Sequence, residues 1–250
     1  MKVLLALLAC VIAATGADIS GRVVGGSAAT IEAIPYQLSV WVKETFKCGG
    51  VIISTKAALT SARCVDGETA STITVNGGTE HRNKKGSLQK VSSIVAHPSY
   101  SRTTWDYDIA ILKLASAFKL GPNIGVATLP SDGETVAVGS LATVSGWGIT
   151  TIGGTEYAGR LQVATMPVVA TSVCTTALSR INKITDRMLC AGYTTGGKDI
   201  CTGDHGGPLV YAKKLIGIVS WGGGCGAVGK PAVFTRIAAL RSWISTKAGV

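Results

Sequence analysis

The stretch best suited to chemistry is the octapeptide Cys201–Pro208, with the sequence CTGDHGGP. It sets a carboxylate, Asp204, and an imidazole, His205, among three glycines. Glycine lets a backbone turn tightly and present its N–H groups to a ligand. An imidazole can act as a base near neutral pH. This concentration of special residues predicts a functional loop rather than a packing segment.

The octapeptide resembles the signature Gly-Asp-Ser-Gly-Gly-Pro of the chymotrypsin/trypsin-like serine proteases, with His205 in the place of the nucleophilic serine. Two further segments carry the resemblance. LTSARC, residues 59–64, resembles the segment that supplies the general base, and DIAILKL, residues 108–114, resembles the one that supplies the orienting aspartate. Family members hydrolyse peptide bonds with serine, histidine and aspartate acting together. Here these three positions hold His205, Arg63 and Asp108.

The residues at the base and nucleophile positions predict that the chain is not an enzyme. A guanidinium stays protonated and has no lone pair to accept a proton, so Arg63 cannot be the general base. Losing the nucleophile or the base lowers turnover by roughly 10⁶. We expect no catalytic residue, no cofactor and no metal. A residual weak serine endopeptidase of trypsin type is the enzymatic alternative.

Asp108 is the one triad residue that is kept, and we expect Arg63 to form an ion pair with it. The resemblance implies that Ser220 donates a hydrogen bond to this carboxylate. In the alternative arrangement, Arg63 turns toward solvent and Asp108 keeps only local hydrogen bonds.

The resemblance also implies a specificity pocket with Asp199 at its base, where it would favour lysine or arginine side chains. Ile200 stands where trypsin-like enzymes carry a small hydroxyl residue, and Ala232 where they usually have glycine. Added side-chain volume is rarely absorbed freely in a packed site, so we expect a narrowed pocket; the alternative is a pocket that adjusts and stays open. The predicted remnant of the pocket consists of Asp199, Ile200, Ser220, Gly222 and Ala232.

The resemblance also implies an oxyanion hole, an activation site and three disulfides. The N–H groups of Gly203 and His205 would form an oxyanion hole. Asp204 would receive the new N-terminal ammonium of Val23 if the chain is cut after Arg22. The implied disulfides are Cys48–Cys64, Cys174–Cys190 and Cys201–Cys225.

The N-terminus indicates secretion. Lys2, an apolar run and small residues up to Gly16 are typical of a signal peptide, so we assign residues 1–16 to the signal, 17–22 to a pro-segment and 23–250 to one homology domain. Of the 7 cysteines, six remain after Cys10 leaves, and an even number is typical of extracellular disulfides. We predict no membrane segment.

Charge narrows the choice of partners. The chain carries a formal net charge of +10, which could favour acidic partners or merely keep a secreted protein in solution. Its basic runs are short and not interleaved with aromatic residues, so nucleic acid is excluded as a partner. We expect a monomer.

Many short β-branched or alternating runs separated by glycine, proline, asparagine or serine predict an all-β fold. The resemblance implies two six-stranded antiparallel β-barrels with a C-terminal helix, and we place the change of barrel near residues 120–130. Helical patterns are few. Thr171 or Ser172 is expected to cap a short helix through Arg180, and Ile237, Leu240, Trp243 and Ile244 form one face of the C-terminal helix.

The sequence is trypsin-like but lacks both the base and the nucleophile. In this respect it resembles the inactivated serine protease paralogues of the scabies mite. That resemblance implies binding of host plasma or complement proteins and inhibition of complement, through the barrel surface. The alternative is a decoy that binds protease inhibitors or substrates through a remnant of the cleft.

Overall fold

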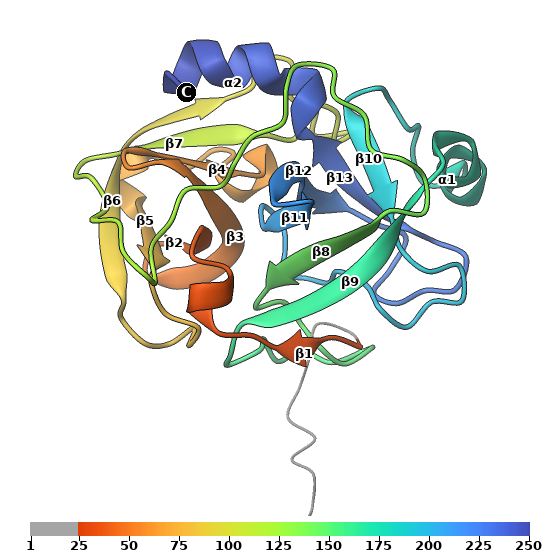
Figure 1. The fold of residues 1–250 in the computed structure, drawn as a ribbon, viewed down its shortest axis with the longest axis horizontal. Coiled ribbons are helices and arrows are strands. Elements are labelled where there is room, and N and C mark those ends of the chain that lie inside the picture. Colours follow the sequence, from red (N-terminus) through yellow and green to blue (C-terminus); the bar gives the residue numbers. More distant parts are fainter. Residues whose placement is uncertain (1–24) are drawn as a thin grey trace, which may run out of the picture.

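The computed structural model describes residues 25–250. The predictions for the signal peptide, the pro-segment, Arg22 and Val23 therefore fall outside the described residues. Within them the chain forms mainly short strands, joined by turns and a few short helices (Figure 1). In chain order the strands are β1 Ser27–Ala28, β2 Gln37–Val42, β3 Thr45–Ser54, β4 Ala57–Thr60, β5 Ile73–Gly77, β6 Ser87–Ala96, β7 Ala110–Leu114, β8 Leu141–Gly146, β9 Gln162–Val169, β10 Met188–Ala191, β11 Pro208–Tyr211, β12 Lys214–Trp221 and β13 Ala232–Arg236.

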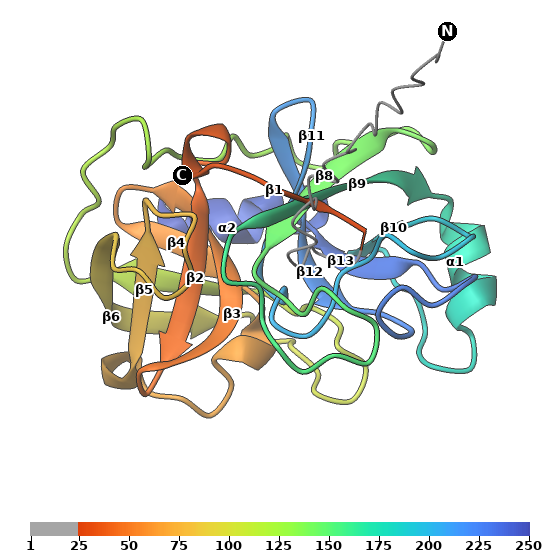
Figure 2. The ribbon, with the colours of Figure 1, turned by 90° about the horizontal axis from the view of Figure 1, so that it is seen from below.

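Two six-stranded antiparallel barrels stand side by side (Figures 1 and 2). The first closes in the order β2-β3-β4-β7-β6-β5. The second runs β9-β10-β13-β12-β11-β8 and closes through the pairing of β8 with β9, while β1 adds to the outer edge of β9. The predicted fold class is confirmed. Residues 115–140 connect the barrels and contain the stretch in which the sequence places the change.

Each barrel has its own apolar core, because inward-facing side chains of its strands meet at the centre. Leu38, Ile52 and Leu112 lie in the first, and Met166 and Phe234 in the second. A third cluster fills the space between the barrels and the C-terminal helix, with Leu59 and Ile111 on one side and Ile218 and Ile244 on the other. Burial of apolar surface stabilises by about 25 cal/mol per Å², so this shared cluster helps to hold the two barrels together.

The helices differ in detail from the expectation. Helix α1 spans Thr171–Leu178, and Thr171 lies inside it rather than capping it, since the cap residue is Ala170 and makes no side-chain hydrogen bond. At the C-terminus, Ile237–Leu240 form a 3₁₀ turn, η4, before helix α2 over Arg241–Ala248. The remaining 3₁₀ turns are η1 Ile31–Ala33, η2 Ala62–Cys64 and η3 Ala70–Thr72.

Two of the thirteen strands carry no clear strand pattern. β10 contains no β-branched residue, and its conformation follows from pairing with β13 along its whole length and with β9 at its end. β1 is only two residues long and is fixed by pairing with β9. Tertiary pairing outweighs local preference at both places.

Three disulfides stabilise the loops: Cys48–Cys64, Cys174–Cys190 and Cys201–Cys225. These are the pairs that the resemblance implies. No helix within residues 25–250 is long and apolar enough to cross a membrane.

Candidate functional site

The residues at the three triad positions come together where the two barrels meet. Arg63 lies in η2, just after β4, and Asp108 lies two residues before β7, both in the first barrel. His205 lies in the turn before β11, and Ser220 near the end of β12, both in the second. The site is therefore assembled only when the barrels dock.

Asp108 is fully buried, with an exposed fraction of 0%. One carboxylate oxygen, Oδ1, accepts a hydrogen bond from the Arg63 main-chain N–H at 3.0 Å. The other, Oδ2, accepts one from the Ser220 hydroxyl at 2.7 Å. Burial raises the pKa of this carboxyl, against the opposing effect of these hydrogen bonds and of the nearby Arg63 charge. The orienting carboxylate thus keeps its support although its imidazole partner is gone.

The Arg63 side chain stays in the cleft, where three neighbours hold it. Its Nε lies 3.8 Å from Asp108 Oδ2, which is the expected ion pair. Its Nη1 donates a hydrogen bond to the main-chain carbonyl of Ser220 at 3.0 Å, and its Cζ lies 4.8 Å from the centre of the Trp105 ring. With the side chain only 24% exposed, the arrangement in which Arg63 turns toward solvent is not the one observed.

His205 is partly buried beside Arg63. Among residues 25–250, none makes a hydrogen bond to its imidazole. Burial, and secondarily the positive charge of Arg63, lowers the pKa of this imidazole to about 4. The ring is neutral at physiological pH as a result. The main chain of His205 joins the two barrels. Its carbonyl accepts a hydrogen bond at 2.8 Å from the Gly49 N–H in β3 of the other barrel.

The main-chain N–H groups of Gly203 and His205 are the two that the resemblance assigns to an oxyanion hole. The Thr202 carbonyl accepts a hydrogen bond from the Ile149 N–H at 2.9 Å, and the Asp204 carbonyl accepts one from the Gly207 N–H at 2.9 Å. In a planar trans peptide the N–H points opposite to the carbonyl, which fixes the directions of the Gly203 and His205 N–H groups. Neither donates to an acceptor within the described part of the chain. Their assignment to an oxyanion hole stays a prediction.

The cavity at this site has a volume of about 210 Å³. Its walls include Arg63, Trp105, Ile200, His205 and Trp221. The two tryptophan rings lie 5.5 Å apart, centre to centre. Neither tryptophan was among the site residues predicted from the sequence, although Trp105 stands just before the DIAILKL segment and Trp221 directly follows Ser220.

The predicted base of the specificity pocket is separated from this cavity. Asp199 is 4% exposed and accepts hydrogen bonds from the Ile200 and Gly226 N–H groups at 2.8 and 2.7 Å. It borders a second, very small pocket without room for a water molecule. Burial raises the pKa of Asp199 to about 6. Ile200 and Ala232 pack into the apolar core of the second barrel, a geometry that supports the expected narrowing. Gly222 lies exposed on the wall of the larger cavity.

Asp204 is 1% exposed and accepts hydrogen bonds from the Gly148 N–H at 2.8 Å and the Cys201 N–H at 3.0 Å. Burial raises the pKa of this carboxyl to about 6. Because Val23 lies outside the described residues, the ion pair expected between its ammonium and Asp204 stays a prediction.

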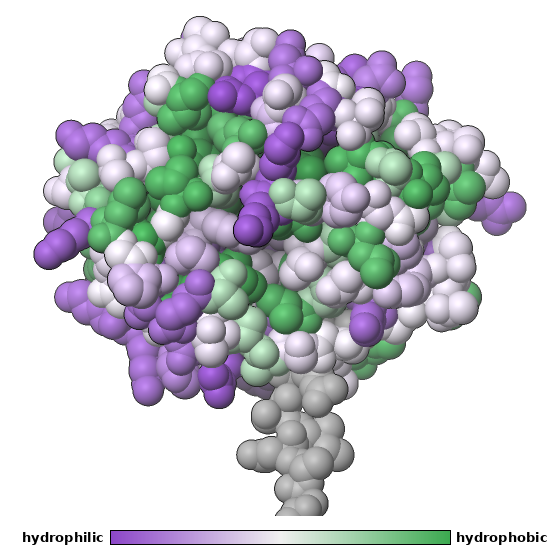
Figure 3. All heavy atoms as spheres, in the orientation of Figure 1, coloured by the Kyte–Doolittle hydropathy of each residue, from purple (hydrophilic) through white to green (hydrophobic). Residues whose placement is uncertain are grey.

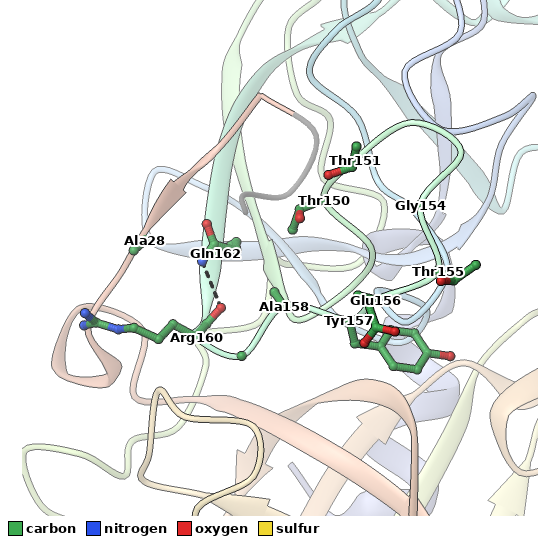
Figure 4. Close-up of a pocket in the computed structure, with 11 residues that line it drawn as sticks. Ala28, Thr150, Thr151, Gly154, Thr155, Glu156, Tyr157, Ala158, Arg160 and Gln162 are labelled. Atoms are coloured by element: carbon green, nitrogen blue, oxygen red, sulfur yellow. Dashed lines mark hydrogen bonds between the residues drawn. The ribbon is translucent and has the colours of Figure 1, made fainter. Parts of the chain in front are cut away.

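A larger pocket, of about 690 Å³, lies away from the triad positions, between β1 and the loop over residues 150–160 (Figure 4). Thr150 and Thr151 stand on one side, and Ala28 and Gln162 on the other. The Gln162 side chain donates a hydrogen bond to the Arg160 carbonyl at 2.9 Å. None of the predicted site residues that lie within residues 25–250 lines this pocket.

Comparison with known proteins gives one consistent result. The family model described as Trypsin matches residues 23–244. The chain is 37% identical over 233 residues to Trypsin 5G1 of Aedes aegypti, covering 92% of this chain and 86% of the relative. It is 36% identical over 252 residues to Trypsin delta of Drosophila melanogaster, covering 98% of each. It is 37% identical over 223 residues to the vitellin-degrading protease of Bombyx mori, covering 89% of this chain and 84% of the relative.

These comparisons contradict the expectation that the chain is not an enzyme. Relatives at this level of identity are named as trypsins or as a protease, and the family model is that of trypsin. They point to a protease. Since neither Arg63 nor His205 supplies the group that the serine–histidine–aspartate mechanism needs at its position, peptide hydrolysis here requires a different set of groups.

Proposed function

We propose that this chain, which belongs to the trypsin family, is a secreted protein that uses its barrel surface to bind host plasma proteins, complement components among them, and so inhibits complement. The proposal rests on one observation, the position of Arg63 in the cleft between the barrels. Arg63 is fixed by Asp108, Ser220 and Trp105 where the family places its base, while the two-barrel scaffold and its disulfides are complete.

Three properties support binding through the outer surface. The scaffold is tied by disulfides, so its loops lose little conformational entropy on association. The net positive charge favours encounter with acidic proteins. Figure 3 shows hydrophobic residues dispersed among hydrophilic ones on the face in view, which is typical of the mixed surface of a transient interface. The finer resemblance to the inactivated mite paralogues supports complement as the target.

The test is a complement-lysis assay with the purified protein, followed by binding measurements with individually purified complement components. We expect dose-dependent inhibition of lysis and saturable binding of at least one component. Because the barrel surface is the proposed contact, Trp105→Ala, which alters only the cleft wall, should inhibit as well as the unmodified chain. Absence of both inhibition and binding would reject the proposal.

A second candidate function is weak endopeptidase activity of trypsin type, and the comparisons with named trypsins favour it. Asp199 would then direct cleavage to lysine and arginine. The test uses lysine and arginine ester and amide substrates. Activity that belongs to this chain should fall in Asp199→Asn and in His205→Ala. Activity that persists in both variants and is blocked by a serine-directed probe comes from a contaminating enzyme.

The decoy alternative has its own outcome. A protein inhibitor of trypsin inserts a lysine or arginine side chain into the specificity pocket, at which this chain carries Ile200 and Ala232. Tight binding of such an inhibitor, lost in Asp199→Asn, would favour the decoy over binding through the barrel surface.

A further inference from the structure

The cleft gathers hydrogen-bond donors without matching acceptors. The guanidinium of Arg63 has five N–H groups in a rigid plane. One donates to the Ser220 carbonyl, and the Nε group faces Asp108 Oδ2 at 3.8 Å. The Gly203 and His205 N–H groups, on consecutive turns of the 201–208 loop, have no acceptor among residues 25–250. The Asp204 N–H between them donates to the Cys201 carbonyl at 3.0 Å, and of the two residues His205 is the one that lines the cavity.

We propose that this cleft binds a carboxylate, the one at the C-terminal end of a peptide chain whose last residue is apolar. Arg63 would meet the carboxylate oxygens from one side, and the main-chain N–H of His205, which also lines the cavity, would meet them from the other. Arginine suits this role because its planar fork matches the geometry of a carboxylate. This site is distinct from the surface proposed for plasma proteins.

Arg63 is fixed in a position that serves such a ligand. It lines the 210 Å³ cavity, and its contacts with the Ser220 carbonyl and the Trp105 ring hold the side chain in place. A side chain that is ordered before binding loses little entropy when the ligand arrives. The Arg63 side chain is thus in position before an anion binds.

Asp108 opposes an incoming anion, but only in part. Its carboxylate is fully buried, does not line the cavity, and has a hydrogen bond on each oxygen. His205, which does line the cavity, is neutral at physiological pH. The charged group that the cavity exposes is therefore Arg63.

The remaining walls select the residue that carries the carboxylate. Trp105, Ile200 and Trp221 give the cavity apolar surfaces. Asp199, which would attract a lysine or arginine, lies in a separate small pocket. A volume of about 210 Å³ holds roughly seven waters' worth of ligand, enough for one aliphatic side chain. We expect a terminal leucine to be preferred over a terminal lysine.

The experiment compares N-acetyl-L-leucine with N-acetyl-L-leucinamide, which share the side chain and differ in the carboxylate. Binding is followed by calorimetry and by the ring signals of His205, one of 3 histidines in the chain, in nuclear magnetic resonance. We expect the acid to bind at least tenfold more tightly than the amide and to raise the pKa of His205, whereas the amide leaves that pKa unchanged.

Variants assign the interaction to Arg63. Arg63→Gln should weaken binding of the acid about tenfold or more, as expected for a lost charge-assisted hydrogen bond. Arg63→Lys keeps the charge next to Asp108 and the fold, and should bind with intermediate strength because the planar fork is gone. Arg180→Gln removes the same charge from an exposed position after α1 and should bind like the unmodified chain.

Several results would overturn the proposal. Equal affinity for acid and amide would show that the carboxylate is not recognised. An unchanged affinity in Arg63→Gln, in a protein shown by circular dichroism to be folded, would place the site elsewhere. Inorganic sulfate that binds as tightly as N-acetyl-L-leucine would reject a peptide end as the ligand. The outcome does not depend on complement binding, so this proposal and the proposed function can fail separately.

Discussion

At the scale of single residues, Arg63 and His205 change the electrostatics of the cleft in opposite ways. Arg63 brings a fixed positive charge, and the low pKa of His205 keeps a second one away. Burial raises the pKa of Asp108, and the donors on its two oxygens oppose this shift in place of an imidazole. We therefore expect the hydrogen bonds to this carboxyl group to contribute to the free energy of unfolding.

Ser220→Ala should lower the free energy of unfolding by about 1–3 kcal/mol, because it leaves a buried carboxyl oxygen of Asp108 without its donor. Urea unfolding near neutral pH measures the change. Ser99→Ala is the matched control, since Ser99 is exposed and its replacement should cost less than about 0.5 kcal/mol. Equal effects of the two variants would contradict the burial of Asp108.

His205 should make the protein more stable as the pH rises from about 4 to 6.5. The imidazole has its ordinary pKa near 6.5 when unfolded and a pKa of about 4 when folded, so the unfolded chain binds more protons in this window. The measurement is the difference in unfolding free energy between the unmodified chain and His205→Ala across this pH range. A difference that does not vary with pH would show an exposed, unperturbed ring.

At the scale of elements, the turn before β11 is held by close backbone contacts that leave no room for side chains. Gly206 has a φ of 79°, and a Cβ atom there would overlap Thr60 Oγ1 and the Gly49 carbonyl of the first barrel. Gly229 has a similar φ of 71°, but nothing lies within 4 Å of the place its Cβ would take. This pair separates backbone strain from steric overlap.

Gly206→Ala should lower the free energy of unfolding by more than about 3 kcal/mol, since strain and overlap add. Gly229→Ala, with strain alone, should lower it by about 1 kcal/mol. Thermal unfolding of both variants tests this prediction. Similar melting temperatures would mean that the barrels can move apart at the turn and relieve the overlap without loss of stability.

Helix α1 and strand β10 depend on the bond between Cys174 and Cys190. Replacing both cysteines by alanine should cost roughly 3 kcal/mol, the value expected for a loop of this length. Hydrogen exchange should show the loss first in Met188–Ala191, whose sequence has little strand preference. Uniform loss of protection over the second barrel would mean instead that β10 is held by its neighbours alone.

The sequence predicted most of the fold and only part of the site. Strands such as Gln37–Val42 carry β-branched residues and could be recognised, whereas Met188–Ala191 becomes a strand only through its partners. Arg63, Asp108 and Ser220 could be placed together through their motifs. The position of Trp105 could not, because it follows from a left-handed φ of 51° and from ion pairing of the next residue, Asp106, with Arg187 at 2.5 Å.

At the scale of the whole molecule, two buried carboxylates in the second barrel affect the response to pH. Asp199 and Asp204 are both almost inaccessible, and both have a pKa of about 6. Each is hydrogen-bonded to main-chain N–H groups. Because their folded pKa values lie above the unfolded value near 3.9, the folded chain binds more protons between these limits.

The free energy of unfolding should therefore fall as the pH rises from about 4 to 6, by up to about 3 kcal/mol for each carboxylate. Asp204→Asn should flatten this decline and Asp199→Asn should do the same, while the contribution of His205 runs in the opposite direction. Melting curves at a series of pH values measure the balance. A decline unaffected by either variant would show that both carboxylates reach solvent or find a cationic partner.

The hydrogen bond from the Gly49 N–H to the His205 carbonyl has a consequence for how this scaffold can diverge. It joins the barrels through an atom that every amino acid possesses, so position 205 serves assembly with its main chain and leaves its side chain unconstrained by that task. Architecture and chemistry are thus inherited separately at this position. A substitution of the side chain at this position therefore leaves the hydrogen bond that joins the barrels in place.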